Sequence, residues 1–215
     1  MKKLLILDCD WVLYNHRELD VNAMVYAFNI VCDELDAEEY KFTRIIHCTE
    51  DKPIKWFYNY IRYTSNKLSI DMDEFIEKMI DKIDYSRIER DSDWILDILD
   101  WLHSNYEICV CTNNHKKHLD RILKVKFNLT SDNFPYPCFD VTFSEIQWKY
   151  YPKQSPEFIS KIESYFDIKP SDFVWIDDTP SVLEKATELW CNCILVDDEN
   201  VLINILQSLS EYWKN

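Results

Sequence analysis

The chain has 215 residues, enough for one sizeable domain or for a core domain with a smaller inserted one. Its hydrophobic content of 47% and aromatic content of 15% are typical of a globular protein and argue against a disordered chain. The formal net charge of -15 argues against general binding to nucleic acid or to a membrane surface, because both of these partners are anionic.

The sequence contains no glycine. Average usage of roughly 7% would give about 15 glycines in a chain of this length. Positions that need a positive φ must then be filled by Asn, Asp or another residue under strain. The absence of glycine also excludes the Gly-rich phosphate-binding loops of the Walker and dinucleotide types.

The apolar run of MKKLLIL ends at Asp8, which is too short for the core of a signal peptide, and no run approaches membrane-spanning length. The eight cysteines include two C-x-C pairs in apolar, strand-like segments, Cys109/Cys111 and Cys191/Cys193. Buried reduced thiols are the favoured interpretation, and a zinc site is the alternative. We therefore expect a cytoplasmic protein.

The chain opens with a predicted strand at 3–8, which ends on two acidic residues. The stretch 15–88 then offers helices but no clear strand: Val21, Val25 and Phe28 recur at helical spacing, and a further helix is predicted to begin at Asp71. We interpret 15–88 as a helical insertion. Its aromatic residues are expected to pack in the core or at an interface, with the lining of a substrate pocket as the alternative; they include Trp56, Tyr58, Tyr60 and Tyr63.

From residue 91 onward, predicted helices and strands alternate regularly. Helices are expected at 91–102, 118–127, 155–166, 180–190 and 199–213, and strands at 107–112, 139–143, 173–178 and 193–196. This alternation is typical of an α/β fold with a Rossmann-like parallel sheet and helices on both faces. The sheet domain would comprise 1–14 and 89–215.

Polar side chains follow the predicted strands at their carboxyl ends, where open α/β sheets bind ligands. Several carboxylates that face one point repel each other and favour a divalent cation such as Mg²⁺. A magnesium ion and a lysine together could hold a phosphate, and one carboxylate could then attack phosphorus to give an aspartyl-phosphate. The side chains in question are Asp8, Asp10, Thr112, Asn113, Asn114, Lys153, Asp177 and Asp178.

Four segments in this order resemble the four motifs of the haloacid dehalogenase-like (HAD) hydrolase superfamily. They are DCDWVL, VCTNN, KQSPEFI and VWIDDTPSVLEKA. The resemblance extends from end to end and implies that the insertion at 15–88 is a small helical cap domain. It favours the phosphatase branch, because the dehalogenase branch lacks an acid at the position of Asp10.

The resemblance also implies a role for each residue of the set. Asp8 would be the nucleophile and a metal ligand, and Asp10 the general acid and base, with its backbone carbonyl on the metal. Thr112, Asn113 and Lys153 would bind the phosphoryl group, and Lys153 would also steady Asp8. Asp177 would bind Mg²⁺, with Asp178 assisting directly or through a water molecule.

Several residues leave alternatives open. Lys149 is a rival for the role of Lys153, and Trp11 stands where the family usually has a small or polar residue. An indole there could block the site, or could exclude water and stack on a substrate. His115 and His118 lie three residues apart in a helical segment, which permits a metal pair, but a solvated helix face is the favoured interpretation.

The sequence therefore predicts a Mg²⁺-dependent phosphatase that hydrolyses a small phosphorylated metabolite, such as a nucleotide or a sugar phosphate, through an aspartyl-phosphate. The expected partners are this metabolite and no nucleic acid or membrane, and the protein would be a monomer or a homodimer. The alternatives are a non-catalytic HAD-like binding protein and a phosphotransferase of the phosphomutase type.

Overall fold

The structure is a computed structural model, and it describes residues 2–14, 19, 22–42, 53–90, 94–143, 153, 155–197 and 201–212. The chain divides into two compact units. Met1–Asn15 and Ile88–Asn215 form the first unit, and His16–Arg87 forms the second. In the described part, no helix is both long enough and apolar enough to cross a membrane.

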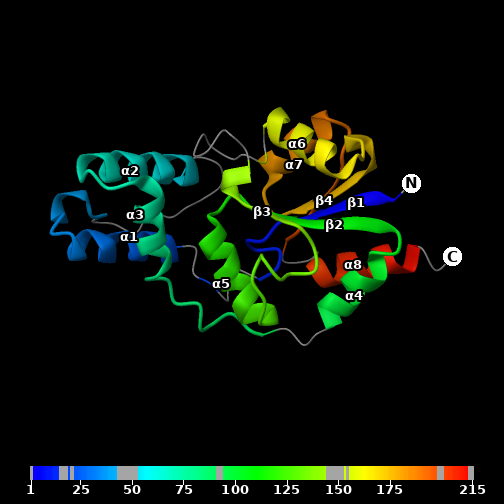
Figure 1. The fold of residues 1–215 in the computed structure, drawn as a ribbon, viewed down its shortest axis with the longest axis horizontal. Coiled ribbons are helices and arrows are strands. Elements are labelled where there is room, and N and C mark those ends of the chain that lie inside the picture. The colour runs from blue at the N-terminus through cyan, green and yellow to red at the C-terminus, as the bar shows by residue number, and fades with distance from the viewer. Residues whose placement is uncertain are drawn as a thin grey trace. The chain divides into compact units, whose positions relative to one another are not determined.

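A five-stranded parallel sheet forms the centre of the first unit (Figure 1). Its strands are β1 (Lys3–Leu7), β2 (Tyr106–Cys111), β3 (Cys138–Phe139), β4 (Phe173–Asp177) and β5 (Asn192–Leu195). They lie in the order β3-β2-β1-β4-β5, and each neighbouring pair is parallel. The predicted α/β fold with a Rossmann-like parallel sheet is confirmed.

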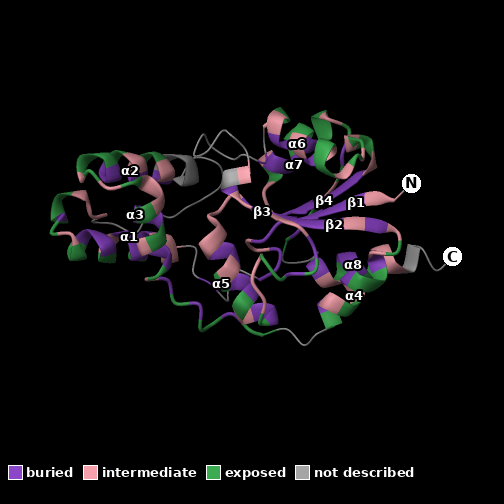
Figure 2. Ribbon diagram, viewed as in Figure 1, coloured by how far each residue is buried: buried purple, intermediate pink, exposed green. Residues whose placement is uncertain are grey.

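Helices cover both faces of this sheet (Figure 1). On one face lie α6 (Pro156–Phe166) and α7 (Pro180–Glu188), and on the other lie α4 (Trp94–Leu102), α5 (Lys116–Phe127) and α8 (Leu202–Tyr212). The central strands β1, β2 and β4 are largely buried between these layers (Figure 2), which accounts for their nearly continuous apolar sequences, whereas the edge strand β5 is partly exposed. On the face of α6 and α7, Ile6 and Trp175 pack with Phe158 and Val182.

The prediction of a strand at 139–143 is wrong in its extent. Only Cys138–Phe139 pairs with β2, at the edge of the sheet, and Val141–Phe143 forms a short 3-10 helix, η2. The Val141 amide donates to the Asn114 carbonyl, and the Phe143 amide donates to the Asp140 carbonyl. These bonds turn the chain away from the edge, where a second neighbour is absent among the described strands.

The second unit consists of α1 (Ala23–Glu34), the 3-10 helix η1 (Glu38–Tyr40), α2 (Pro53–Lys67) and α3 (Met72–Ile80). The Phe28 ring lies within 6.0 Å, centroid to centroid, of four other rings, those of Phe42, Phe57, Tyr60 and Phe75. Phe57 and Tyr60 therefore pack as expected, whereas Tyr63 is 50% exposed. The Trp56 side chain lies outside the described residues.

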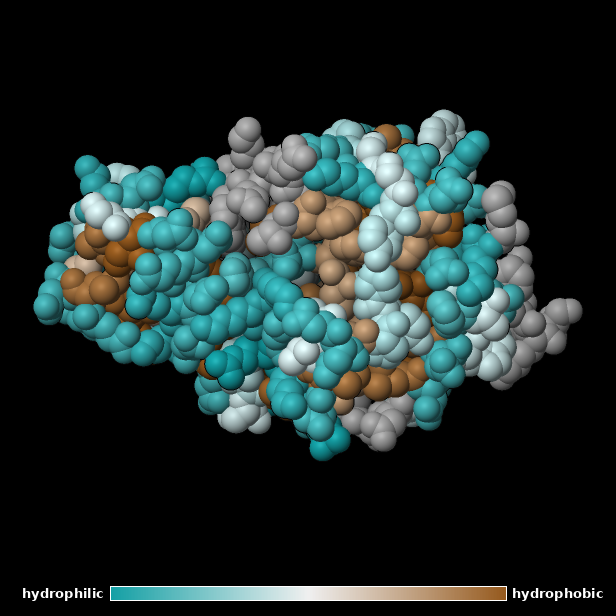
Figure 3. All heavy atoms as spheres, in the orientation of Figure 1, coloured by the Kyte–Doolittle hydropathy of each residue, from teal (hydrophilic) through white to brown (hydrophobic). Residues whose placement is uncertain are grey.

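The N-caps of two predicted helices are as expected. Asp71 accepts from the amides of Asp73 and Glu74 at the start of α3, and Ser155 accepts from the amide of Phe158 at the start of α6. Some large exposed hydrophobic residues share a helix, such as Tyr26 and Ile30 on α1 and Trp94 and Trp101 on α4. On the face shown in Figure 3, hydrophilic side chains surround smaller hydrophobic areas.

Non-glycine residues take the left-handed backbone conformation at several places in this glycine-free chain. Five of them lie one or two residues beyond the end of a helix: Asp36, Ser69, Asn128, Asp167 and Trp190. After α7, the Trp190 amide donates to the Thr187 carbonyl and the Cys191 amide to the Ala186 carbonyl, which is the Schellman pattern. Glycine is the usual residue at this point, yet here it is a tryptophan with φ of 70° and 82% exposure.

Trp190→Gly should stabilise the protein. A left-handed residue with a Cβ costs about 1–2 kcal/mol, whereas the extra freedom of an unfolded glycine costs about 0.4–1 kcal/mol, so we expect a net gain of roughly 0.5–1 kcal/mol in the free energy of unfolding. Urea denaturation measures this change. Trp190→Ala is the matched control, because it removes the same indole but keeps the strain; equal stabilities of the two variants would contradict the prediction.

Candidate active site

Three acidic or hydroxyl side chains come together because the strands that carry them are neighbours. Asp8 directly follows β1, which lies between β2 and β4, while Thr112 follows β2 and Asp177 ends β4. The Asp8 amide donates to the Ile176 carbonyl at 2.9 Å, and the Thr112 amide donates to the Phe139 carbonyl at 2.9 Å. Backbone bonds therefore hold these residues at the carboxyl edge of the sheet.

Lys153 joins two of these acids. Its ammonium nitrogen lies 2.6 Å from the Asp8 Oδ1 atom and 2.7 Å from the Asp177 Oδ2 atom, and all three side chains are buried. Burial alone would lower the pKa of Lys153, but the charges of Asp177 and Asp8 raise it above its ordinary value. Lys153 is therefore a fixed positive charge. Its rival, Lys149, lies outside the described residues.

Asp8, Asp177 and Asp178 form a cluster of acids around this charge. One ligand oxygen from each lies within 4.8 Å of the others, and among the described residues this is the group that could hold a metal ion. Burial, followed by the charge of Asp177, raises the pKa of Asp8 well above its ordinary value. The same two causes raise the pKa of Asp178 to about 6. Three carboxylates thus surround one ammonium.

Asp10 has a different set of partners. Its Oδ1 atom lies 2.6 Å from the Tyr14 hydroxyl and 2.8 Å from the His118 Nε2 atom. Its Oδ2 atom accepts from the Asn114 amide at 2.6 Å and from the Thr112 hydroxyl at 3.1 Å. Burial would raise the pKa of Asp10, but the charge and the hydrogen bond of His118, with the bonds of Tyr14 and Asn114, lower it.

The amides after β2 take two directions. Asn113 Oδ1 accepts from the Lys153 backbone amide at 3.2 Å and so holds the lysine segment beside β2. The Asn114 amide nitrogen of the backbone donates to the Thr112 hydroxyl at 3.0 Å, while its side chain reaches Asp10. The two residues therefore connect Lys153 and Asp10 to the same strand end.

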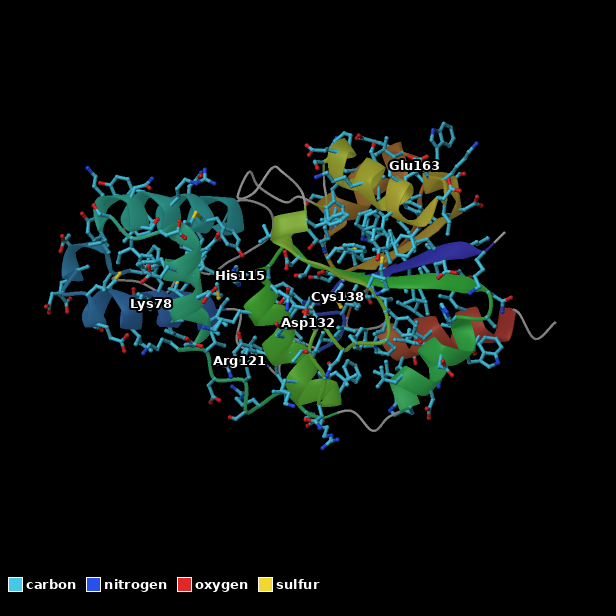
Figure 4. The ribbon with its side chains drawn as sticks, viewed as in Figure 1. Lys78, His115, Arg121, Asp132, Cys138 and Glu163 are labelled. Carbon is cyan, nitrogen blue, oxygen red and sulfur yellow. The ribbon has the colours of Figure 1, made fainter. Side chains whose placement is uncertain are left out.

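The expectation that His118 lies on a solvated helix face is wrong. His118 is 4% exposed, and its ring meets Asp10. The signal that could have placed it is its spacing: it lies four residues before the buried Ile122, on the side of α5 that faces the core. His115 is instead the N-cap of α5: its Nδ1 atom accepts from the Lys117 amide at 3.1 Å, and it lies at the N-terminal end of that helix (Figure 4).

The turn after Asp10 is tight. The Leu13 amide donates to the Cys9 carbonyl at 3.0 Å, and Trp11 has a φ of 56°, in the left-handed region that glycine normally fills. The Trp11 side chain is partly exposed. Cys9 and the other cysteines of the described part are free thiols, and most of them are buried.

Comparisons with known proteins give a match in structure and none in sequence. No protein-family model and no curated protein matches the chain. Among solved structures, CbbY from Rhodobacter sphaeroides in complex with phosphate matches with a TM-score of 0.59 at 13% identity, over 94% of this chain and 88% of that one. A predicted HAD-like family hydrolase from Porphyromonas gingivalis matches with a TM-score of 0.59 at 18% identity, over 97% and 98% of the two chains.

The fold is that of the HAD-like hydrolases. A third HAD family enzyme, BT-2542 from Bacteroides thetaiotaomicron in complex with magnesium and inorganic phosphate, matches with a TM-score of 0.55 at 17% identity, over 92% of this chain and 95% of that one. The resemblance that the four sequence motifs indicated is thus confirmed at the level of the HAD-like fold. At these identities the comparisons speak for the fold, and the roles of individual residues stay predictions.

Lys153→Met should strongly destabilise the protein in the absence of metal. The change leaves the buried Asp8 and Asp177 carboxylates without their shared cation, and breaking such a pair costs about 3–5 kcal/mol. The free energy of unfolding from urea denaturation in EDTA measures the loss.

Lys185→Met is the matched control, because Lys185 is exposed and pairs with Glu188 on the surface of α7. We expect a change within about 0.5 kcal/mol for this variant. Similar losses in the two variants would show that the buried ion pairs do not stabilise the fold.

Proposed function

We propose that this protein is a Mg²⁺-dependent phosphatase that hydrolyses a small phosphomonoester through an aspartyl-phosphate on Asp8. The observation that carries the proposal is the arrangement around the Asp8 carboxylate. It is buried, contacts the Lys153 ammonium, and shares a cluster with Asp177 and Asp178. Such a carboxylate can attack phosphorus, because the Lys153 ammonium and a metal ion would offset its repulsion by the negatively charged phosphoryl oxygens.

The residues present fit a magnesium ion. Asp8, Asp177 and Asp178 supply carboxylate oxygens, the ligands that Mg²⁺ prefers, and their mutual repulsion is only partly offset by Lys153. The resemblance to the HAD superfamily adds the backbone carbonyl of Asp10 to this set. When bound, the ion would neutralise oxygens of the transferring phosphoryl group.

In the first step, an Asp8 carboxylate oxygen forms a bond to phosphorus while the bond from phosphorus to the ester oxygen breaks. Asp10 must take up a proton before this step, against the lowered pKa that His118, Tyr14 and Asn114 give it, and it passes that proton to the ester oxygen, which leaves as an alcohol. The Lys153 ammonium and the hydroxyl of Thr112 donate to the equatorial oxygens, which stabilises the charge of the transition state. The products of this step are the alcohol, the Asp8 phosphate and the Asp10 carboxylate.

In the second step, the Asp10 carboxylate takes a proton from a water molecule, whose oxygen bonds to phosphorus as the bond to Asp8 breaks. Inorganic phosphate leaves, Asp8 returns to a carboxylate, and Asp10 is protonated again for the next turnover. Asn113 keeps Lys153 in place through both steps, because it accepts from the backbone amide of that residue.

The structural neighbours support a phosphorylated substrate. CbbY was solved with phosphate, its D10N variant with xylulose-1,5-bisphosphate, and BT-2542 with magnesium and inorganic phosphate. By analogy we propose a small phosphorylated metabolite, such as a nucleotide or a sugar phosphate, and a cap role for the helical unit His16–Arg87. The alternative of a non-catalytic binding protein rests on the indole at Trp11; transfer of the phosphoryl group to a sugar hydroxyl is the other alternative.

Purified protein with Mg²⁺ should hydrolyse p-nitrophenyl phosphate, and EDTA should abolish this activity. Asp8→Asn should lower kcat by at least about 10³-fold while the protein stays folded, because the amide cannot attack phosphorus. Release of p-nitrophenol measures the rate, and circular dichroism checks the fold. Activity that survives EDTA or the substitution would contradict the mechanism, and no turnover across a panel of phosphate esters would favour the binding protein.

Mg²⁺ should raise the melting temperature of the wild type, because the ion relieves the repulsion within the acidic cluster. Asp178→Asn should weaken this shift severalfold, since it removes one carboxylate ligand. Asp172→Asn, which changes an acid before β4 outside the cluster, is the matched control and should keep the full shift. A shift of the same size in all three proteins would place the ion elsewhere.

A further inference from the structure

Both oxygens of the Asp10 carboxylate accept hydrogen bonds, and each oxygen accepts them from different residues. Tyr14 and His118 meet Oδ1, whereas Thr112 and Asn114 meet Oδ2. An ionised carboxylate only accepts hydrogen bonds, so the His118 Nε2 atom donates in this contact. Asp10 is thereby held from three segments, the turn after β1, the end of β2 and helix α5.

The donors on Oδ2 have a second use in the proposed reaction. Thr112 and the amides that follow it stand at the end of β2, where the phosphoryl oxygens of the substrate would lie, and Thr112 is assigned to one of these oxygens. When it turns its hydroxyl to the phosphoryl group, Oδ2 loses a donor. In the proposed reaction, neither Tyr14 nor His118 donates to the phosphoryl group.

Tyr14 and His118 are also held firmly in place. Tyr14 is 5% exposed and His118 is 4% exposed, so neither side chain can readily exchange Asp10 for water. Each is held by its own element: Tyr14 by the turn that the Leu13-to-Cys9 hydrogen bond closes, and His118 by the first turns of α5. The Oδ1 contacts are 2.6 and 2.8 Å long; Asn114 lies equally close to Oδ2, at 2.6 Å, so the two oxygens differ in the burial and number of their lasting donors and not in distance.

From this asymmetry we infer that Tyr14 and His118 are positioning residues that anchor Oδ1 of Asp10, and that Oδ2 is the oxygen that gives the proton to the leaving group. The inference rests on the proposed function. The step itself is unchanged: the proton leaves Oδ2, the ester oxygen receives it, and the bond between that oxygen and phosphorus breaks.

A positioning role predicts a specific pattern of loss. A poor leaving group, an alkyl alcohol, needs the proton in the transition state, whereas 2,4-dinitrophenolate leaves well without it. The ratio kcat/KM reports the chemistry up to the first irreversible step, here the transfer to Asp8, so it isolates the proton donation from the later attack of water.

The experiment compares the double variant Tyr14→Phe/His118→Leu with the wild type on an alkyl phosphate that the wild type hydrolyses and on 2,4-dinitrophenyl phosphate. Because correctly placed general acids contribute about 10²–10⁴-fold, we expect kcat/KM to fall about 10²-fold on the alkyl ester. On the dinitrophenyl ester we expect a loss of less than about threefold by the same reasoning. The retained activity on the second ester shows that the variant is folded.

Single variants sharpen the test. Tyr14→Phe removes only a hydroxyl and should show a smaller loss with the same preference for the alkyl ester, and His118→Gln, which keeps an N–H donor, should recover part of what His118→Leu loses. Tyr136→Phe removes a hydroxyl from another buried tyrosine of the same unit, away from Asp10, and should leave both rates unchanged.

Equal losses on the two esters, or no loss on either, would overturn the inference while leaving the phosphatase itself in place. A wild-type protein that hydrolyses neither ester would overturn the proposed function, and the inference with it. The two failures are therefore distinguishable in one set of measurements.

Discussion

One buried ammonium group ties the carboxyl edge of the sheet together. Lys153 contacts Asp8 after β1 and Asp177 at the end of β4, with distances of 2.6 and 2.7 Å. Burying any of these charges alone would cost several kcal/mol, so each depends on the others for its place in the core. Because Asp178 adds a further carboxylate to the same spot, the neutralisation is incomplete. The interaction that stabilises the fold here also leaves the negative charge that would hold a metal ion.

The position of these acids could be predicted because topology is easier to read than packing. Parallel strands end at one edge of their sheet, so acids that follow apolar strands must meet there, whichever helices cover the faces. Asp8 and Asp177 come together for this reason. Lys153 lies outside the regular strands and the long helices, and periodicity says nothing about such a residue. Its place among the acids was expected from its position just before the capped helix at Ser155 and from the motif resemblance, and the structure brings it to Asp8 and Asp177.

What could not be predicted depends on contacts between distant segments. His118 and Asp10 are far apart in the sequence, and the residues around His118 in α5 do not indicate that its ring contacts a carboxylate from the turn after β1. The length of β3 could not be predicted for the same reason. Its apolar sequence fits a longer strand, but its edge position and the Val141-to-Asn114 hydrogen bond end the strand after two residues. In both cases the tertiary partner decides, and local propensity does not.

In this glycine-free chain, a tryptophan takes the left-handed conformation in the turn after Asp10. At the ends of α1, α2 and α7 the left-handed residues Asp36, Ser69 and Trp190 belong to Schellman turns, which their backbone bonds close. Trp11 belongs to no helix end, and a bulky residue there is strained by about 1–2 kcal/mol. The chain leaves β1 after Leu7, and beyond it Asp8 meets Lys153 while Asp10 meets Tyr14 and His118. In an extended strand these two acids would share one face and one set of partners. Because Trp11 lies between Asp10 and Tyr14, its strained conformation belongs to the turn that brings the Tyr14 hydroxyl back to the Asp10 carboxylate.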